Sequence, residues 1–153
     1  VINNYSNTKK RQLASYLKAS LSTFFSKPPP LSIEIAINSE LFSLKPFMVF
    51  VSNSNEMGYD ISLTPKASIQ DGMLDVIIVE TLNKLEIIYF AFLLLIKKPQ
   101  KFKKAHYFLT KNIEITNLLN GSVLTQIDGE SRQIDSNTLK ISIKKEALSV
   151  IIP

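Results

Sequence analysis

The chain has 153 residues, no cysteine and a formal net charge of +5. The length allows one domain with its own hydrophobic core, and the lack of cysteine excludes disulfides and thiolate–metal sites. Lysine supplies most of the positive charge, which suits anionic partners such as phosphates or acidic lipid surfaces. Because the first residue is Val1 rather than methionine, we expect a piece of a longer polypeptide, with residues 1–10 as a linker from a missing upstream part.

The apolar period changes once in the first third of the chain. From residue 11 to residue 25 apolar side chains recur at intervals of three and four, which predicts an amphipathic helix that ends at prolines 28–30. Over residues 33–37 isoleucine alternates with other residues, which predicts a half-buried strand. Two further short strands are predicted over 41–44 and 47–51, followed by a polar loop over 52–58.

The stretch that follows joins a tight turn to an apolar strand. Asp71-Gly72 forms the turn, and residues 74–80 are apolar and β-branched, which predicts a buried strand. In such a turn an aspartate side chain commonly bonds its own backbone, and this is one interpretation of Asp71. We expect Asp75 to be a surface or edge residue of the strand.

One strong helix signal lies over residues 83–98. Asn83 and Glu86 have the spacing of a capping box, Lys97-Lys98 complement the C-terminal end, and Pro99 stops the helix. The middle of this helix is apolar on all sides. We favour a core position for it over contact with a membrane, and the apolar run is too short to span a bilayer, which takes about 20 residues.

The remainder of the chain predicts strands separated by turns, at Asn120-Gly121 and at Asp128-Gly129. Many short strands with turn signals indicate a mainly β, α+β domain, either an antiparallel sandwich or barrel-like, with two added helices. The strands are predicted over 107–116, 123–127, 139–143 and 148–152.

Two motifs in this chain stand out. The first is Pro65-Lys66-Ala67-Ser68-Ile69-Gln70-Asp71-Gly72-Met73-Leu74-Asp75, and the second is Asp128-Gly129-Glu130. They resemble the patterns Pro-x-Ala-x-x-x-Asp-Gly-x-Leu-Asp and Asp-Gly-Glu of the diacylglycerol kinase-like lipid kinases, a family that includes bacterial lipid kinases and sphingosine and ceramide kinases. The two motifs occur in the family's order, and the resemblance covers residues 11–153.

The resemblance implies a fold and a place in a larger enzyme. Residues 11–153 would be the carboxy-terminal β-sandwich domain of the NAD kinase/diacylglycerol kinase-like superfamily. The family's nucleotide-binding half, with its Gly-Gly-Asp-Gly-Thr motif, would lie upstream and is absent from this chain. The four glycines are scattered and build no phosphate-binding loop. We therefore expect this chain alone to be inactive and ATP to bind mainly to the missing domain.

The resemblance also implies site residues. Glu130 would be the catalytic general base on the lipid hydroxyl, supported by the turn residues Asp128 and Gly129. Asp71 would bind a structural Mg²⁺ together with the main-chain carbonyls of Ser68 and Met73, and a second role of Mg²⁺ would be to accompany ATP. The chain departs from the family pattern after Asn55, where glycines are usual and only Gly58 is present.

The implied reaction transfers the ATP γ-phosphate to a diacylglycerol-like or sphingoid lipid. The implied location is cytoplasmic, with peripheral contact at the inner face of the membrane. An NAD kinase-like enzyme and a non-catalytic β-domain that binds a lipid or a partner remain the alternatives, and no pattern indicates nucleic-acid binding. The basic residues that could contact anionic headgroups are Lys97, Lys98, Lys101, Lys103 and Lys104.

Overall fold

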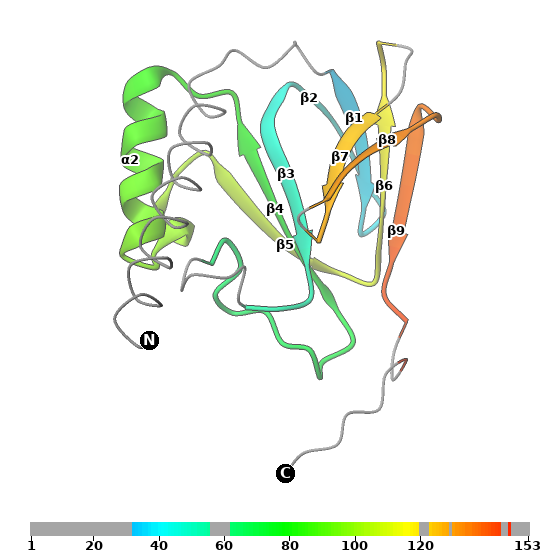
Figure 1. The fold of residues 1–153 in the computed structure, drawn as a ribbon, viewed down its shortest axis with the longest axis horizontal. Coiled ribbons are helices and arrows are strands. Elements are labelled where there is room, and N and C mark those ends of the chain that lie inside the picture. Colours follow the sequence, from blue (N-terminus) through cyan, green and yellow to red (C-terminus); the bar gives the residue numbers. More distant parts are fainter. Residues whose placement is uncertain (1–31, 56–61, 120–122, 129, 145–146, 148–153) are drawn as a thin grey trace, which may run out of the picture.

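Two antiparallel sheets face each other in the computed structural model, which describes residues 32–55, 62–119, 123–128, 130–144 and 147 (Figure 1). One sheet has the strand order β2-β1-β6-β9 and the other the order β3-β4-β5, while β7 and β8 pair as a separate hairpin. The predicted antiparallel sandwich is confirmed, and the sheets of the described part do not close into a barrel. The strands are β1 (Ile33–Ile37), β2 (Glu40–Leu44), β3 (Pro46–Ser52), β4 (Leu74–Glu80), β5 (Ala105–Thr110), β6 (Asn112–Asn117), β7 (Val123–Ile127), β8 (Glu130–Ile134) and β9 (Thr138–Ser142).

The core between the two sheets follows from the period of two in their strands. The isoleucines of β1 are all buried, whereas Glu34 and Ala36 between them are only partly buried. Strand β1 contributes this apolar face to the first sheet, and Val76 and Ile78 of β4 contribute the opposing one. The buried residues of this layer are Ile33, Ile35, Ile37, Val76, Ile78, Ile113 and Ile115.

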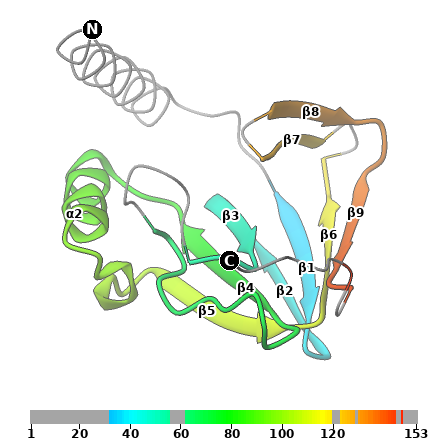
Figure 2. The same ribbon diagram turned by 60° about the horizontal axis from the view of Figure 1, so that its bottom comes forward.

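Strand β4 is buried on both faces, because it is the central strand of its sheet and a helix covers the outer face. Ile77 and Val79 alternate with the residues that face the sandwich core, and they pack against Phe90 and Leu93 of α2 (Lys84–Leu95). Helix α2 therefore lies on the side of the β3-β4-β5 sheet away from β1 and β6 (Figure 2). Because both faces of β4 are buried, its sequence is an almost continuous run of apolar residues.

Helix α2 begins as predicted and ends earlier than predicted. The Asn83 side chain accepts from the backbone N–H of Glu86 at 3.0 Å, and Glu86 Oε2 accepts from the backbone N–H of Asn83 at 2.8 Å, which completes the capping box. At the other end Lys97 has a positive φ of 55°, and the N–H groups of Lys97 and Lys98 donate to the carbonyls of Leu94 and Leu93. This Schellman-type ending places both lysines outside the helix.

Some other sequence predictions differ from the observed secondary structure, and others concern residues outside the described part of the chain. The single strand expected over 107–116 is two strands, β5 and β6, which belong to different sheets and are separated at Lys111. Thr110 Oγ1 donates to the carbonyl of Asn112 at 2.6 Å across this corner. Strand β8 had no apolar pattern to predict it. The predicted helix over 11–25, the Asn120-Gly121 turn and the strand over 148–152 lie outside the described residues.

Candidate functional site

The loop from residue 62 to residue 73 carries the first motif and lies over one end of the β3-β4-β5 sheet. Leu63 and Ala67 are buried, so this loop packs as part of the domain. Hydrogen bonds hold its start: Thr64 Oγ1 donates to the carbonyl of Ser54 at 3.2 Å, and the Tyr107 hydroxyl donates to the carbonyl of Leu63 at 3.3 Å. The loop thus presents its last residues at a defined position before β4.

Asp71 is exposed and forms the predicted turn. Its Oδ1 accepts from the backbone N–H of Met73 at 2.9 Å, and Gly72 between them has a positive φ of 67°, which glycine adopts without steric cost. Ser68 Oγ accepts from the backbone N–H of Gln70 at 3.3 Å. The structure therefore contains the hydrogen bond expected between the Asp71 side chain and the nearby backbone. This bond uses one of the two carboxylate oxygens.

Asp75 is buried, so the expected surface or edge position was wrong. The residue is 9% exposed in the central strand of its sheet, paired with Ser52 on β3 and Leu109 on β5. Its Oδ2 has no hydrogen-bond partner. Burial raises the pKa of the Asp75 carboxyl above its usual range, and the negative charge of Asp71 raises it further. An acid inside the apolar run of β4 was a sequence signal of this burial.

Glu130 is the first residue of β8, and its side chain is exposed to solvent. Its side chain is 72% exposed, and Oε2 accepts from Arg132 Nη2 at 2.9 Å. Arg132 lies two residues further along the strand, and a strand places such residues on the same face. The pairing of Glu130 with Ile127 leaves a two-residue connection, in which Asp128 has a positive φ of 49°. That backbone supports turn geometry as the role of Asp128, and Gly129 lies outside the described residues.

The two motifs are not brought together. The loop before β4 and the β7–β8 hairpin lie on different sides of the domain in Figure 2. Within the part of the chain that the structure describes, no ion pair or hydrogen bond joins Glu130 to Asp71 or Asp75. The two motifs therefore form separate candidate sites, one with a solvated acid and one with a buried acid.

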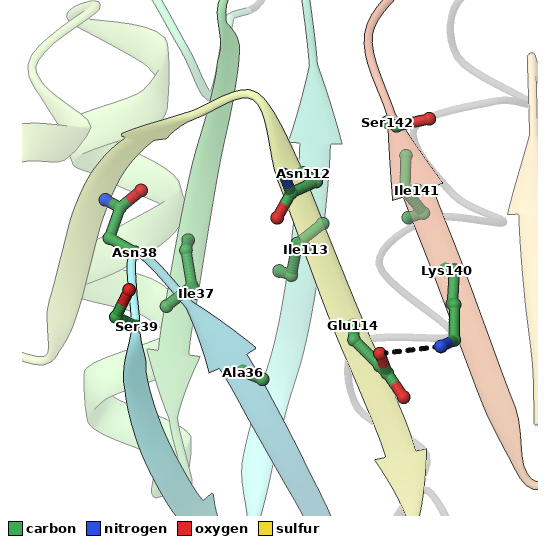
Figure 3. Close-up of a pocket in the computed structure, with 10 residues that line it drawn as sticks. All are labelled: Ala36, Ile37, Asn38, Ser39, Asn112, Ile113, Glu114, Lys140, Ile141 and Ser142. Atoms are coloured by element: carbon green, nitrogen blue, oxygen red, sulfur yellow. Dashed lines mark ion pairs between the residues drawn. The ribbon is translucent and has the colours of Figure 1, made fainter.

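A hollow on the four-stranded sheet has no part in either site. It lies where the β1–β2 turn meets the ends of β6 and β9 (Figure 3). Within it Glu114 Oε2 and Lys140 Nζ face each other at 3.1 Å, so the two charges neutralise one another. None of its lining residues is a predicted site residue; they are Ala36, Ile37, Asn38, Ser39, Asn112, Ile113, Glu114, Lys140, Ile141 and Ser142.

The predicted lysine cluster is spread along α2. Lys97 and Lys98 follow the last turn of the helix, whereas Lys104 lies at the first turn, with Nζ 2.7 Å from Glu86 Oε1 and 3.2 Å from the carbonyl of Thr81. Lys101 and Lys103 are exposed between these two ends. The basic residues therefore flank the helix rather than forming one compact patch.

The expectation that α2 is wholly core holds for one face only. Phe90 and Leu93 are buried against the sheet, but a stripe of large apolar side chains on α2 faces the solvent, with Leu85 78% and Leu95 69% exposed. Spacings of three and four place these side chains on one face of the helix. The exposed apolar stripe consists of Leu85, Ile88, Tyr89, Phe92, Leu95 and Ile96.

No helix in the described part of the chain has the length and apolar content to cross a membrane. Groups of three or more histidine, cysteine, aspartate or glutamate side chains that could hold a metal are also absent from the described residues. Among the described residues, the carboxylates that the first motif offers to a metal are those of Asp71 and Asp75.

Comparison with known proteins gives one family match. The sequence profile described as the YegS C-terminal NAD kinase beta sandwich-like domain matches residues 1–151. A comparison with curated proteins gives no match.

Solved structures of similar fold come from Bacillus anthracis str. Sterne. A diacylglycerol kinase from this organism has a TM-score of 0.61 and 21% identity, over 83% of this chain and 42% of that chain. A candidate diacylglycerol kinase from the same organism has a TM-score of 0.60 and 20% identity, over 80% of this chain and 42% of that chain. At these identities the similarity shows the fold alone. The chain spans well under half the length of these solved proteins.

Proposed function

The chain belongs to the family of YegS C-terminal NAD kinase β-sandwich-like domains, and from this premise we propose that it is the carboxy-terminal domain of a lipid kinase. The observation that carries the proposal is the family match over residues 1–151, within which Asp71 and Glu130 occupy the acidic positions of the two lipid-kinase-like motifs. The domain supplies the acceptor side of the active site, and an upstream domain supplies the ATP side.

The proposed reaction moves the γ-phosphoryl group of ATP to a lipid hydroxyl. The hydroxyl oxygen forms a bond to the γ-phosphorus as the bond from that phosphorus to the β–γ bridging oxygen breaks, and ADP leaves with the bond's electron pair. The hydroxyl proton passes to the Glu130 carboxylate, which acts as general base. Phosphoryl transfer depends mainly on positioning and charge stabilisation, so one placed carboxylate is a sufficient contribution from this domain.

The surroundings of Glu130 support this role. The carboxylate is exposed on a hairpin, where an upstream domain and a lipid headgroup can both reach it, and Arg132 holds it by an ion pair. Ile127, its cross-strand partner, is 53% exposed and offers apolar contact beside the carboxylate. A diacylglycerol-like or sphingoid molecule has this combination of a hydroxyl next to apolar chains.

The first motif fits a bound Mg²⁺ by the chemistry of its donors. Asp71 retains a carboxylate oxygen that does not bond Met73, and Asp75 has a buried oxygen without a partner. Oxygen donors of this kind are those that Mg²⁺ prefers. Asp71 and the carbonyls of Ser68 and Met73 would hold the ion, which would brace the loop before β4. A second Mg²⁺ would accompany ATP in the upstream domain.

The role of Glu130 is tested in the polypeptide that includes the upstream domain. Glu130→Gln keeps the side-chain shape and removes the base, and we expect kcat for phosphate transfer to lipid to fall by roughly 10²- to 10⁴-fold. Glu114→Gln is the matched control, because Glu114 is also a strand glutamate paired with a cation, although it is partly buried. A Glu130→Gln enzyme that retains the wild-type kcat contradicts this role.

We also propose that α2 and its flanking lysines rest on an anionic membrane. An exposed apolar stripe with basic residues at both ends can rest on a bilayer surface, where the apolar side chains enter the interface and the cations meet the headgroups. The exposed stripe supports this position, because monomeric proteins rarely expose so many large apolar side chains together.

The membrane contact is tested with vesicles of phosphatidylglycerol and phosphatidylcholine. Each exposed lysine near an anionic surface contributes about 1 kcal/mol, so Lys101→Ala should weaken partitioning about fivefold. Phe92→Ser should weaken it further, and Leu41→Ser on β2, which is 64% exposed, should have no effect. Wild-type protein that stays in solution, or a Phe92→Ser variant that partitions as the wild type does, contradicts the contact.

A further inference from the structure

Nothing in the described part of the chain covers the exposed apolar stripe of α2. Leu85, Ile88 and Phe92 are each more than half exposed. On the other face of the helix, Phe90 and Leu93 are buried against the sheet. Moving apolar surface out of water is favourable, and folded proteins rarely leave a stripe of this size open. The stripe therefore needs a cover whenever the protein is not on a membrane.

A second apolar stripe occurs in the sequence before β1. Residues 11–25 lie outside the described residues, and their sequence predicts an amphipathic helix. A helix of this length is about 22 Å long, close to the length of α2, about 18 Å, and in water it depends on packing of its apolar face. The residues that would share this face are Leu13, Tyr16, Leu17, Leu21, Phe24 and Phe25.

The chain enters the described domain at the end where α2 begins. Ile33, at the start of β1, pairs with Leu44 on β2. The next residue on that side, Lys45, accepts a hydrogen bond from Thr81 Oγ1 through its carbonyl, at 2.6 Å. Thr81 lies two residues before Asn83, the N-cap of α2. The start of β1 and the first turn of α2 therefore lie at the same end of the domain, which is the top in Figure 1.

Residues 26–31 connect the predicted helix to β1 and are long enough to reach α2. When extended, these six residues span up to about 20 Å, and prolines 28–30 favour an extended chain. Packed sheets lie about 10 Å apart, so the connection can pass the end of the β3-β4-β5 sheet to the helix on its outer side. Because residue 25 would arrive where α2 begins, the two helices would run antiparallel.

We propose that residues 11–25 cover the exposed apolar stripe of α2 in solution and leave it when α2 meets an anionic membrane. The release rests on the membrane contact proposed above. In the antiparallel arrangement the basic residues 9–11 come beside Lys97 and Lys98, at the far end of α2. Like charges repel one another, and anionic headgroups attract all of them. The lipid surface that binds the lysines therefore also favours release of the cover.

Cysteine cross-linking tests the cover without lipid or ATP, because the chain has no cysteine of its own. In the antiparallel arrangement Leu21 lies over Ile88, so a short bismaleimide should link most molecules of Leu21→Cys/Ile88→Cys within one chain. Leu21→Cys/Leu41→Cys is the matched control and should give at least tenfold less, since Leu41 is an exposed apolar residue on the outer face of the other sheet. Equal yields in the two variants overturn the proposal.

A second pair and a single variant guard this result. Leu17→Cys/Phe92→Cys, about one helical turn further along, should cross-link as the first pair does, so a folding defect in one variant does not decide the outcome. Absence of the link in both pairs overturns the proposal. Ile88→Cys alone should stay monomeric, and a cross-linked dimer of this variant would place a second copy on the stripe and overturn the proposal as well.

Vesicles of phosphatidylglycerol and phosphatidylcholine test the release. Cross-linked Leu21→Cys/Ile88→Cys should partition at least tenfold more weakly than the same variant capped with N-ethylmaleimide, because the closed cover withholds the apolar stripe from the bilayer. Equal partitioning of the two forms overturns the release. Wild-type protein that stays in solution would contradict the membrane contact and with it the release, whereas the cross-linking yields without lipid still decide the cover.

Discussion

Asp75 and Glu130 are acids in opposite surroundings, and this difference decides what each can do. Glu130 is exposed with a cationic neighbour, so its carboxylate is available to a substrate that approaches from outside. Asp75 is buried in the central strand of its sheet, so its carboxylate is shielded from the solvent. At the residue scale, solvent exposure thus makes Glu130 rather than Asp75 the candidate for a catalytic base.

Arg132 is a positioning residue in this account. Its Nη2 donates to Glu130 Oε2 at 2.9 Å, and because both side chains are largely exposed the pair adds little to stability, about 0–1 kcal/mol. We expect Arg132→Ala to leave the unfolding free energy within that range while kcat falls by roughly ten- to a hundredfold, since the base loses its orientation. Arg132→Lys should restore part of kcat, measured with KM in the intact polypeptide. Unchanged kcat in Arg132→Ala would exclude this role.

The pH dependence of stability also has an origin in single residues. Hydrogen bonds from the Lys104 ammonium and from the backbone N–H of Asn83 hold the pKa of Glu86 below its ordinary value of 4.5. A carboxyl whose folded-state pKa is lowered contributes stability above its unfolded-state pKa and loses it as pH falls through the folded-state value. The stability difference between wild type and Glu86→Gln should therefore be present at about pH 7 and shrink by about pH 3. Urea unfolding at both pH values checks this, and an equal difference at both contradicts it.

At the scale of elements, helix α2 depends on its first turn. Asn83 satisfies the backbone N–H of Glu86, and without this cap a helix donor would be left to water. We expect Asn83→Ala to lower the free energy of unfolding by about 1 kcal/mol, within a range of roughly 0.5–2 kcal/mol. Asn83→Ser should retain most of the stability, because serine also caps. Urea unfolding measures both variants, and an Asn83→Ala protein as stable as the wild type would show that the cap is not used.

Local chemistry made some helices and strands predictable from the sequence. The bounds of others were determined by tertiary structure. The capping residues Asn83 and Glu86 and the isoleucine alternation of β1 are local signals. Strand β1 and the start of α2 formed where they were expected. The break at Lys111 was not predictable from the same kind of signal, because apolar residues continue on both sides of it. It arises because β5 pairs with β4 while β6 pairs with β1, which is a choice between sheets.

Features of the candidate sites were also predictable from the sequence only where they depend on local chemistry. The turns at Asp71 and Asp128 were predictable, since an aspartate before a glycine favours such backbone, and the structure has positive φ at Gly72 and Asp128. The burial of Asp75 was missed because it depends on the pairing of β4 with β3 and β5, which bring Ser52 and Leu109 beside it from distant parts of the chain. Arg132 was missed because its partnership with Glu130 requires β8, a strand with no apolar pattern.

At the scale of the whole molecule, the domain is a sandwich that has two sides of different character. One side of the β3-β4-β5 sheet meets the second sheet, and the other carries α2 with its exposed apolar stripe. The hairpin with Glu130 stands apart from both sheets in strand pairing. Under the proposed function, α2 would face the membrane and the hairpin would face the upstream domain.

The most direct test of this account is phosphate transfer by the polypeptide that includes the upstream domain. Radiolabelled ATP is supplied with diacylglycerol, monoacylglycerol, phosphatidylglycerol, a sphingoid base or, as the soluble competitor, NAD. The account predicts transfer to a lipid hydroxyl, with little label on NAD. Transfer to NAD alone would instead make the protein an NAD kinase-like enzyme, and retained ATP binding without transfer to any acceptor would make the domain a non-catalytic binding module.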